Sequence, residues 1–285
     1  MTMRTYLETT INRILNSSVN SACREQRLAE LRDTISSIVP DIADQCTTGE
    51  LMPPWPNIVR SRHSVQVKLM EAAVSRLDTV SPISVVDIGD SAGTHLRYLM
   101  GLNSNREFQS LSINLDPIAI EKIRSIGLMA IQVRIESMYD HPEFISDADI
   151  YLCFETLEHL CDPVTFLHDL ASNTTGRYLI LSMPYLRKSR VGLHQLRAQP
   201  GHIMTDRQQP FAAESTHIFE LCPEDWNLVF KFAGWRVVES IRYTQYPKHN
   251  PLWLARFLWR RLNFDGHYVV ILQPDDSISS QYLDW

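Results

Sequence analysis

The sequence lacks long apolar runs. Its longest apolar stretches have the length of a strand, and none approaches the roughly 20 residues that a membrane-spanning helix requires. It also lacks an excess of positive charge, because its net charge is −6, and this argues against a general nucleic-acid binder. No internal repeat or low-complexity segment is present, and RNA is disfavoured as a partner because no recognisable RNA-binding module is found.

Cysteine pairs and a secretory signal are also missing. The five cysteines form no C-x-x-C pair, and their odd number suits the reducing conditions of the cytoplasm. The opening residues, MTMRTYLETT, contain no apolar signal core, so we expect a cytoplasmic protein. The composition that is present is ordinary for a globular chain. Its 285 residues, 44% hydrophobic and 21% charged, suffice for an α/β core and an appendage.

The N-terminal part of the chain predicts a helical extension. Apolar residues recur there at helical spacing in two stripes, and a polar residue between them is expected to cap the second helix. The first stripe is Leu7, Ile11, Ile14 and Leu15, the second is Leu28, Leu31, Ile35 and Ile38, and the cap is Asn20 or Ser21. Such stripes pack on the main domain or on a second subunit, which leaves a homo-oligomer open. Three prolines within residues 51–57 indicate a boundary, so we expect an extension over 1–60 and a main domain over 61–285.

Residues 83–99 predict a strand, a glycine turn and the start of a helix. A nearly continuous apolar run that ends at Gly89 is typical of a strand buried on both faces of a parallel sheet. Gly89 and Gly93 bracket three small residues, so the backbone can pass close to a ligand. Asp87, at the end of this strand, lies where ligands bind in open α/β sheets.

This stretch resembles motif I of the class I S-adenosylmethionine (SAM)-dependent methyltransferases, in which an acid is followed by Gly-x-Gly-x-Gly. Asp87, Gly89 and Gly93 match the motif, and Ser91 replaces its middle glycine. The resemblance implies SAM as cofactor and a Rossmann-like α/β fold, with a seven-stranded, mostly parallel sheet whose last strand is antiparallel. It covers about residues 61–273, and further strands are expected at 110–115, 130–133, 148–154, 176–183, 235–243 and 268–273.

The resemblance also implies which residues contact the cofactor. At the end of the first strand and in the turn that follows, these are Asp87, Gly89, Asp90, Ser91 and Gly93. At the second strand, Asn114 or Asp116 is expected to bind the ribose, and after the third strand Arg134 or Glu136 is expected near the adenine. At the end of the fourth strand the contact is Phe154. Ser91, Asn114 and Arg134 depart from the family pattern. The serine leaves room for a ligand, but its Cβ restricts the backbone angle φ.

Residues 155–163, ETLEHLCDP, resemble the E-x-L-E-H segment found after the fourth strand in one branch of the family, and this is the most specific match in the chain. Glu155, Glu158 and His159 have the spacing i, i+3, i+4, which predicts one face of a helix. Together with the distant His217 they are similar to the metal sites of small-RNA 2′-O-methyltransferases and ubiquinone-pathway O-methyltransferases. That resemblance implies Mg²⁺, Mn²⁺ or Zn²⁺ held by these four residues. The alternative is a metal-free site, in which His159 is the first choice for a general base and His217 the second.

Two inserts and a basic pair add further expectations. Residues 184–222 form an unusually long connection, and we hypothesise a lid that closes over an anionic or phosphorylated substrate. Its cationic residues are Arg187, Lys188, Arg190, His194, Arg197, His202 and Arg207. Residues 247–264 combine aromatics with arginines; core packing or an oligomer contact is the favoured interpretation, with a pocket cover or a membrane surface as alternatives. Arg60 and Arg62 precede a helix expected at 63–77 and are interpreted as solvated charges, although they could reach the carboxylate of a cofactor.

The sequence therefore predicts a SAM-dependent methyltransferase that methylates an oxygen atom of a small polar, sugar-like or anionic acceptor. The alternative is a catalytically silent SAM-fold protein that serves as a partner or regulatory subunit, which the three departures from the cofactor pattern favour. A nicotinamide-dependent dehydrogenase is disfavoured, because the turn from Gly89 to Gly93 breaks the G-x-G-x-x-G pattern that such enzymes need.

Overall fold

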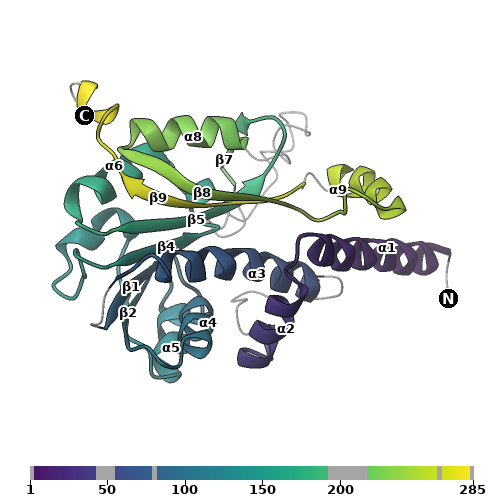
Figure 1. Cartoon of the computed structure of the whole chain (residues 1–285), viewed down its shortest axis with the longest axis horizontal. Helices are drawn as coiled ribbons and strands as arrows, with labels where there is room; N and C mark the ends of the chain where they lie inside the picture. Colours follow the sequence, from purple (N-terminus) through teal and green to yellow (C-terminus); the bar gives the residue numbers. More distant parts are fainter. Residues whose placement is uncertain (1–2, 43–54, 79–81, 192–216, 262–264, 283–285) are drawn as a thin grey trace, which may run out of the picture.

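The computed structural model describes residues 3–42, 55–78, 82–191, 217–261 and 265–282 of the chain. Its centre is a seven-stranded sheet in the order β3-β2-β1-β4-β5-β9-β8 (Figure 1). The strands are β1 (Ile83–Ile88), β2 (Phe108–Asn114), β3 (Ala130–Gln132), β4 (Ile150–Phe154), β5 (Tyr178–Tyr185), β8 (Trp235–Thr244) and β9 (Gly266–Pro274). β1 to β5 are mutually parallel, and β9 runs antiparallel to both β5 and β8. The predicted sheet with an antiparallel last strand is confirmed.

Helices cover both faces of this sheet (Figure 1). They include α3 (Trp55–Val74), α4 (Thr94–Leu102), α5 (Pro117–Ser125), α6 (Pro163–Asn173) and α8 (Pro223–Phe232). Leu69 of α3 and Leu96 of α4 belong to the core of one face, together with Val85 of β1. Phe166 of α6 and Trp226 of α8 belong to the core of the other face. Among the described residues, every helix is too short or too polar for a membrane span.

The N-terminal extension forms two helices, α1 (Met3–Glu25) and α2 (Ala29–Ile38). The expected cap at Asn20 or Ser21 is wrong, because α1 continues past both residues. Their side chains are used in tertiary contacts instead: Asn20 accepts a hydrogen bond from Arg32, and Ser21 accepts one from Asn250. The turn between the two helices contains Arg27 in a left-handed conformation, with φ +57°.

The proline-rich segment leads directly into α3, which begins at Trp55 rather than at residue 63. Pro56 lies in the first turn, where a missing N–H removes no helical hydrogen bond. α3 therefore runs through residue 60, the boundary expected from the sequence, and both α1 and α2 pack against it.

The two inserts extend from the same edge of the sheet. After β5, the short strand β6 (Arg190–Val191) pairs with β7 (Phe219–Glu220). His194, Arg197, His202 and Arg207 of the expected lid lie outside the described residues. Between β8 and β9, a 3-10 turn η6 (Pro251–Ala255) continues into α9 (Arg256–Arg261). Ala255 and Trp259 pack against Leu15 and Val19 of α1, which confirms core packing for these two residues.

Candidate functional site

The loops after β1 and β4 meet at one point of the sheet edge. Chain order runs in opposite directions from these two neighbouring strands, and ligands of open α/β folds bind at such a reversal, outside the carboxyl ends of the strands. The first loop runs from Gly89 to Gly93, and Thr156 lies in the second. A Cβ built on Gly89 would lie 2.5 Å from Thr156 Oγ1, so the two loops approach closely.

Both glycines of the first loop have a left-handed backbone, with φ +85° at Gly89 and +68° at Gly93. Other residues enter this region at a cost of about 1–2 kcal/mol. Gly93 immediately precedes α4, and a Cβ there would lie 2.7 Å from Leu128 Cδ1. The backbone conformation therefore requires glycine at both positions, and the half-buried Ser91 lies between them.

We expect Gly89→Ala to destabilise the protein by about 2–4 kcal/mol, because alanine would have to adopt a left-handed φ and displace Thr156. Thr156 Oγ1 donates a 3.0 Å hydrogen bond to the carbonyl of Phe154, and the displacement would break it. Gly127→Ala is the matched control, because Gly127 has φ +82° and nothing within 4 Å of its Cβ position. In urea unfolding, the control should lower the free energy of unfolding by about 1 kcal/mol. Equal losses for both variants would contradict the prediction.

Asp90 holds the loop from inside. Its buried Oδ1 accepts hydrogen bonds from the backbone N–H groups of Ala92 and Gly93, at 3.1 and 2.9 Å. Its Oδ2 accepts a 2.7 Å hydrogen bond from Ser112 Oγ. Burial raises the pKa of Asp90 despite these bonds. Both carboxylate oxygens are thus engaged within the protein, and Asp90 shapes the loop.

Asp87, the acid expected at the end of the first strand, lies buried beneath this loop. Its Oδ2 has no hydrogen-bond partner, and His95 Nδ1 lies 3.9 Å away. Burial, with the nearby Asp90 carboxylate, raises the pKa of Asp87 well above its usual range. Burial also lowers the pKa of His95 to about 3, so the imidazole is neutral at physiological pH and gives Asp87 no positive partner.

At the end of β2, Asn114 uses both ends of its side chain locally. Its Nδ2 donates to the carbonyl of Asp90 at 2.7 Å, and its Oδ1 accepts from the backbone N–H of Asp116 at 2.8 Å. Asp116 caps α5 through the N–H of Ile118. Leu115, between the two polar residues, is 53% exposed. An exposed leucine at this edge was not predicted from the sequence.

Glu136 and Phe154 lie on different sides of the strand ends. Glu136 is exposed in a short 3-10 helix, η2 (Ile135–Asp140), and pairs with Arg134 at 3.1 Å. Phe154 is the last residue of β4, and its ring lies 4.5 Å from that of His95. Phe154 is therefore packed at the end of β4, whereas Glu136 lies at the surface.

Glu158, His159 and His217 come together above the end of β4. One ligand atom from each lies within 4.8 Å of the other two. The imidazole rings of His159 and His217 are 4.8 Å apart and nearly perpendicular. Glu158 is buried and neither of its carboxylate oxygens has a hydrogen-bond partner. Burial and the neighbouring Glu155 carboxylate raise the pKa of Glu158 well above its usual range.

His217 is oriented by the small β6–β7 sheet. Its Nδ1 lies 3.0 Å from Glu220 Oε1, and Glu220 in turn pairs with Arg190. These contacts outweigh the burial of Glu220 and lower its pKa. Arg190, expected to contact a substrate, is therefore engaged with Glu220, whereas Arg187 and Lys188 are exposed.

Glu155, the fourth expected metal ligand, is not a member of this cluster. The predicted helical face is wrong, because η3 (Leu157–His159) is a single 3-10 turn and Glu155 precedes it with φ +51°. The carboxylate of Glu155 instead pairs with Arg62 at 3.0 Å and lies 3.4 Å from His267 Nδ1. Arg62 is thus partly buried in an ion pair, contrary to its interpretation as a solvated charge.

This ion pair belongs to a buried polar network that the sequence did not predict. Ser182 Oγ donates to Glu155 at 2.8 Å, Gln66 donates to Ser182 Oγ at 2.6 Å, and His95 lies 2.9 Å from Gln66 Oε1. Burial alone would raise the pKa of Glu155, but His267, Arg62 and the Ser182 hydrogen bond hold that pKa well below its usual range. A run of polar residues along α3, from Ser61 to Gln66, was the available signal. The structure buries most of this run, and only Arg62 within it was interpreted as a solvated charge.

No protein-family model matches the chain, and no curated protein matches it in sequence. Solved structures do match. Magnesium protoporphyrin IX methyltransferase from Synechocystis PCC 6803, with bound SAH, has a TM-score of 0.52 at 12% identity and covers 87% of this chain and 99% of its own. The [4+2]-cyclase SpnF has a TM-score of 0.51 at 10% identity and covers 88% of this chain and 97% of its own. The chain therefore has the class I methyltransferase fold, and because a cyclase is similar too, the fold by itself does not identify the reaction.

Proposed function

We propose that this chain is a SAM-dependent methyltransferase that methylates an oxygen atom of a small polar, sugar-like or anionic acceptor. SAM supplies a methyl group on a positively charged sulfur, which a nucleophile attacks in line. The observation that carries the proposal is the pair of left-handed glycines, Gly89 and Gly93, at the reversal point of the sheet. What the protein must contribute is mainly the positioning of two reactants, which accounts for much of the rate of such transfers.

We assign the cofactor to the edge formed by the ends of β1, β2 and β4. The loop from Gly89 to Gly93 offers backbone groups without a Cβ in the way, and Asp90 keeps that loop in shape. Asn114 and Asp116 lie where a ribose would bind, and the exposed Leu115 between them offers apolar surface to an adenine ring. Phe154 supports the reacting end of the cofactor from below.

We assign activation of the acceptor to Glu158, His159 and His217. Hydroxyl groups are poor nucleophiles at neutral pH and need a base or a metal ion. One carboxylate and two imidazoles within 4.8 Å suit Mn²⁺ or Zn²⁺, and Mg²⁺ less well. A cation would coordinate the two buried oxygens of Glu158, which accept no hydrogen bond, and when bound it would lower the pKa of the acceptor hydroxyl. Without a cation, His159 and then His217 are the candidates for the general base.

Isothermal titration with S-adenosylhomocysteine tests the cofactor assignment. We expect a dissociation constant of about 1–100 μM, weakened at least about tenfold by Gly89→Ala and unchanged by the control Gly127→Ala. No measurable heat for the wild-type protein would overturn the proposal. A separate titration with Mn²⁺ tests the cation site, and its failure alone would leave the methyltransferase proposal standing with a histidine base.

A catalytically silent SAM-fold subunit is the second candidate, and Asn114 is the observation that favours it. Both polar ends of this side chain are engaged by Asp90 and Asp116, which leaves less capacity for ribose hydroxyls. Such a subunit would bind S-adenosylhomocysteine weakly or not at all. It would also transfer no methyl group from radiolabelled SAM to any component of a fractionated small-molecule extract.

A further inference from the structure

The insert between β8 and β9 uses only one side of its helix to pack on the protein. Trp259 is buried against α1, where its Nε1 donates to Ser18 Oγ at 3.3 Å. Asn250 fixes the start of the insert through Ser21 at 2.6 Å. Leu254 and Phe257, three residues apart on the other side, are both 54% exposed. The insert is therefore firmly anchored and still presents large apolar side chains to solvent.

A cation lies among these exposed apolar groups. The guanidinium carbon of Arg256 lies 3.7 Å from the centre of the Trp253 ring and 4.8 Å from that of Phe257. No carboxylate of the described residues pairs with Arg256, and its Nε is buried without a hydrogen-bond partner. We call Trp253, Leu254, Arg256 and Phe257 the α9 patch. It combines aromatic rings, an aliphatic side chain and a positive charge that has no negative partner within the described structure.

The segment that carries the α9 patch has charges of one sign. Residues 250–264 contain three arginines and no aspartate or glutamate, in a chain whose net charge is −6. Of the two described arginine side chains, Arg260 lies 3.5 Å from Asp265, which leaves Arg256 as the uncompensated one. The neighbouring α1 carries both signs, with three arginines and two glutamates. The patch therefore suits a partner that is both apolar and anionic.

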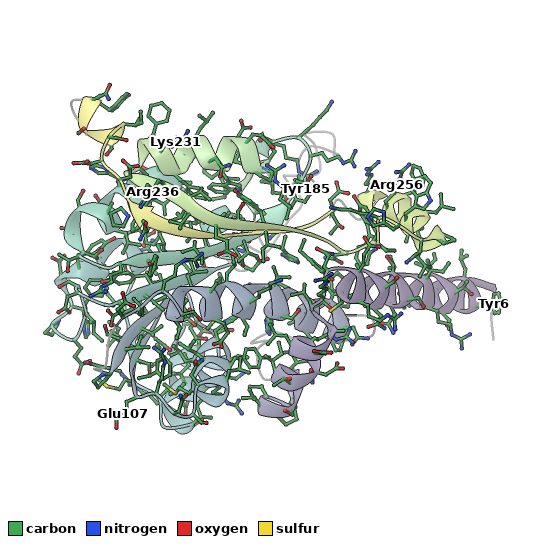
Figure 2. All side chains as sticks on the ribbon, in the orientation of Figure 1. Tyr6, Glu107, Tyr185, Lys231, Arg236 and Arg256 are labelled. Carbon is green, nitrogen blue, oxygen red and sulfur yellow. The ribbon has the colours of Figure 1, made fainter. Side chains whose placement is uncertain are left out.

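The patch also lies on a projection of the molecule. Figure 1 shows α1 and α9 extending together away from the sheet, and Figure 2 shows Arg256 and Tyr6 on this projection. Tyr6 and Leu7, near the outer end of α1, are 63% and 58% exposed. Both helices of the projection thus carry exposed apolar side chains.

We propose that the α9 patch docks on the surface of a membrane that contains anionic lipids. Tryptophan, phenylalanine and leucine insert at the boundary between headgroups and acyl chains, and arginine binds lipid phosphates, which is how amphipathic segments lie on membranes. A two-fold dimer through this patch would bury the uncompensated Arg256 of both copies in one interface, and like charges disfavour that arrangement. α9 joins β8 and β9 at the edge where the candidate site lies, so docking would turn that edge towards the bilayer.

Co-sedimentation of the full-length protein with phospholipid vesicles tests this proposal. We expect binding to vesicles that contain about a quarter phosphatidylglycerol in phosphatidylcholine, little binding to phosphatidylcholine alone, and release as salt rises from about 0.1 to 0.5 M. The double variant Leu254→Ser/Phe257→Ser should lower the bound fraction at least about fivefold. Arg256→Gln should weaken binding to anionic vesicles while leaving the fold intact, as circular dichroism can verify.

The matched control is Leu228→Ser/Phe232→Ser on α8, whose side chains are similarly exposed, at 53% and 45%. It should bind vesicles as the wild-type protein does. Failure of the wild-type protein to bind anionic vesicles would overturn the proposal. So would a dimer in light scattering that the Leu254→Ser/Phe257→Ser variant converts to monomer, because the patch would then be a contact between copies of the chain. Neither outcome bears on SAM binding.

Discussion

Replacing Glu158 by glutamine is expected to abolish cation binding and, at the same time, to stabilise the cation-free protein at alkaline pH. The carboxylate is buried, and neither oxygen has a hydrogen-bond partner. An unsatisfied buried polar group costs about 1–3 kcal/mol, and more when it is charged. Glutamine has nearly the same shape but never carries the charge. Removing a functional group often stabilises a protein, because the buried group lowers the free energy of unfolding when its ligand is absent.

The pH dependence of this effect follows from the raised pKa of Glu158. Because burial and Glu155 raise that pKa in the folded protein, the carboxyl is protonated at low pH and becomes destabilising as pH rises through its folded pKa. The stability gained by the glutamine variant should therefore be small near pH 5 and grow to about 1–3 kcal/mol at alkaline pH, in the presence of a chelator.

Thermal unfolding at both pH values, with and without Mn²⁺, measures these effects. Mn²⁺ should raise the melting temperature of the wild-type protein and not that of Glu158→Gln, whose dissociation constant for Mn²⁺ should be at least about 100-fold weaker. His168→Ala is the control for Mn²⁺ bound by histidines elsewhere. His168 lies on α6 and is not part of the cluster, so this variant should bind Mn²⁺ as the wild-type protein does. A glutamine variant that binds Mn²⁺ as the wild-type protein does would contradict the cation site.

Replacing Glu155 by alanine is expected to have the opposite effect on stability. The variant would leave Arg62 and His267 without the carboxylate that lies between them, and Ser182 without its acceptor. Removing one partner of a buried ion pair typically costs about 3–5 kcal/mol, because the remaining charge stays buried. We therefore expect the melting temperature to fall by about 10 °C.

Two comparisons make this prediction specific. Glu136→Ala removes an exposed carboxylate that pairs with Arg134, with side chains 52% and 63% exposed, and should change stability by less than about 0.5 kcal/mol. The double variant Arg62→Met/Glu155→Met should recover most of the loss, because it removes both charges and keeps the volume. If Glu155→Ala lowered the free energy of unfolding no more than Glu136→Ala does, the buried network would not stabilise the protein, and the prediction would be wrong.

Acid should diminish the contribution of Glu155. Since His267 and Arg62 hold the pKa of Glu155 well below its usual value of 4.5, its stabilising effect is present above that value and is lost as pH falls through the lower folded pKa. The difference in stability between the wild-type protein and Glu155→Ala should therefore be constant from pH 7 to about 5 and shrink below that.

The sequence by itself determined the sheet and the glycine loop that follows its first strand. The apolar run that ends at Gly89 identified β1, and further apolar segments, in the order that the family resemblance implies, located the other strands to within a few residues. These signals are local, because the burial of a strand or of one helix face produces a pattern of apolar residues within a short segment of the sequence. The sequence also predicted that Glu158, His159 and His217 lie close together. That prediction came from the resemblance to metal-dependent methyltransferases and not from periodicity.

Only the tertiary structure decided where Glu155 points. Its spacing to Glu158 and His159 predicted a shared helix face, but the helix is a single 3-10 turn, and the partner of Glu155 is Arg62, 93 residues away in the sequence. The same holds for Ser21, whose hydroxyl meets Asn250 and caps no helix. Hydrogen-bonding and charged side chains take whichever partner the packing of distant elements presents, because an unpaired polar group is costly to bury. That choice depends on residues far apart in the chain, and no local pattern contains it.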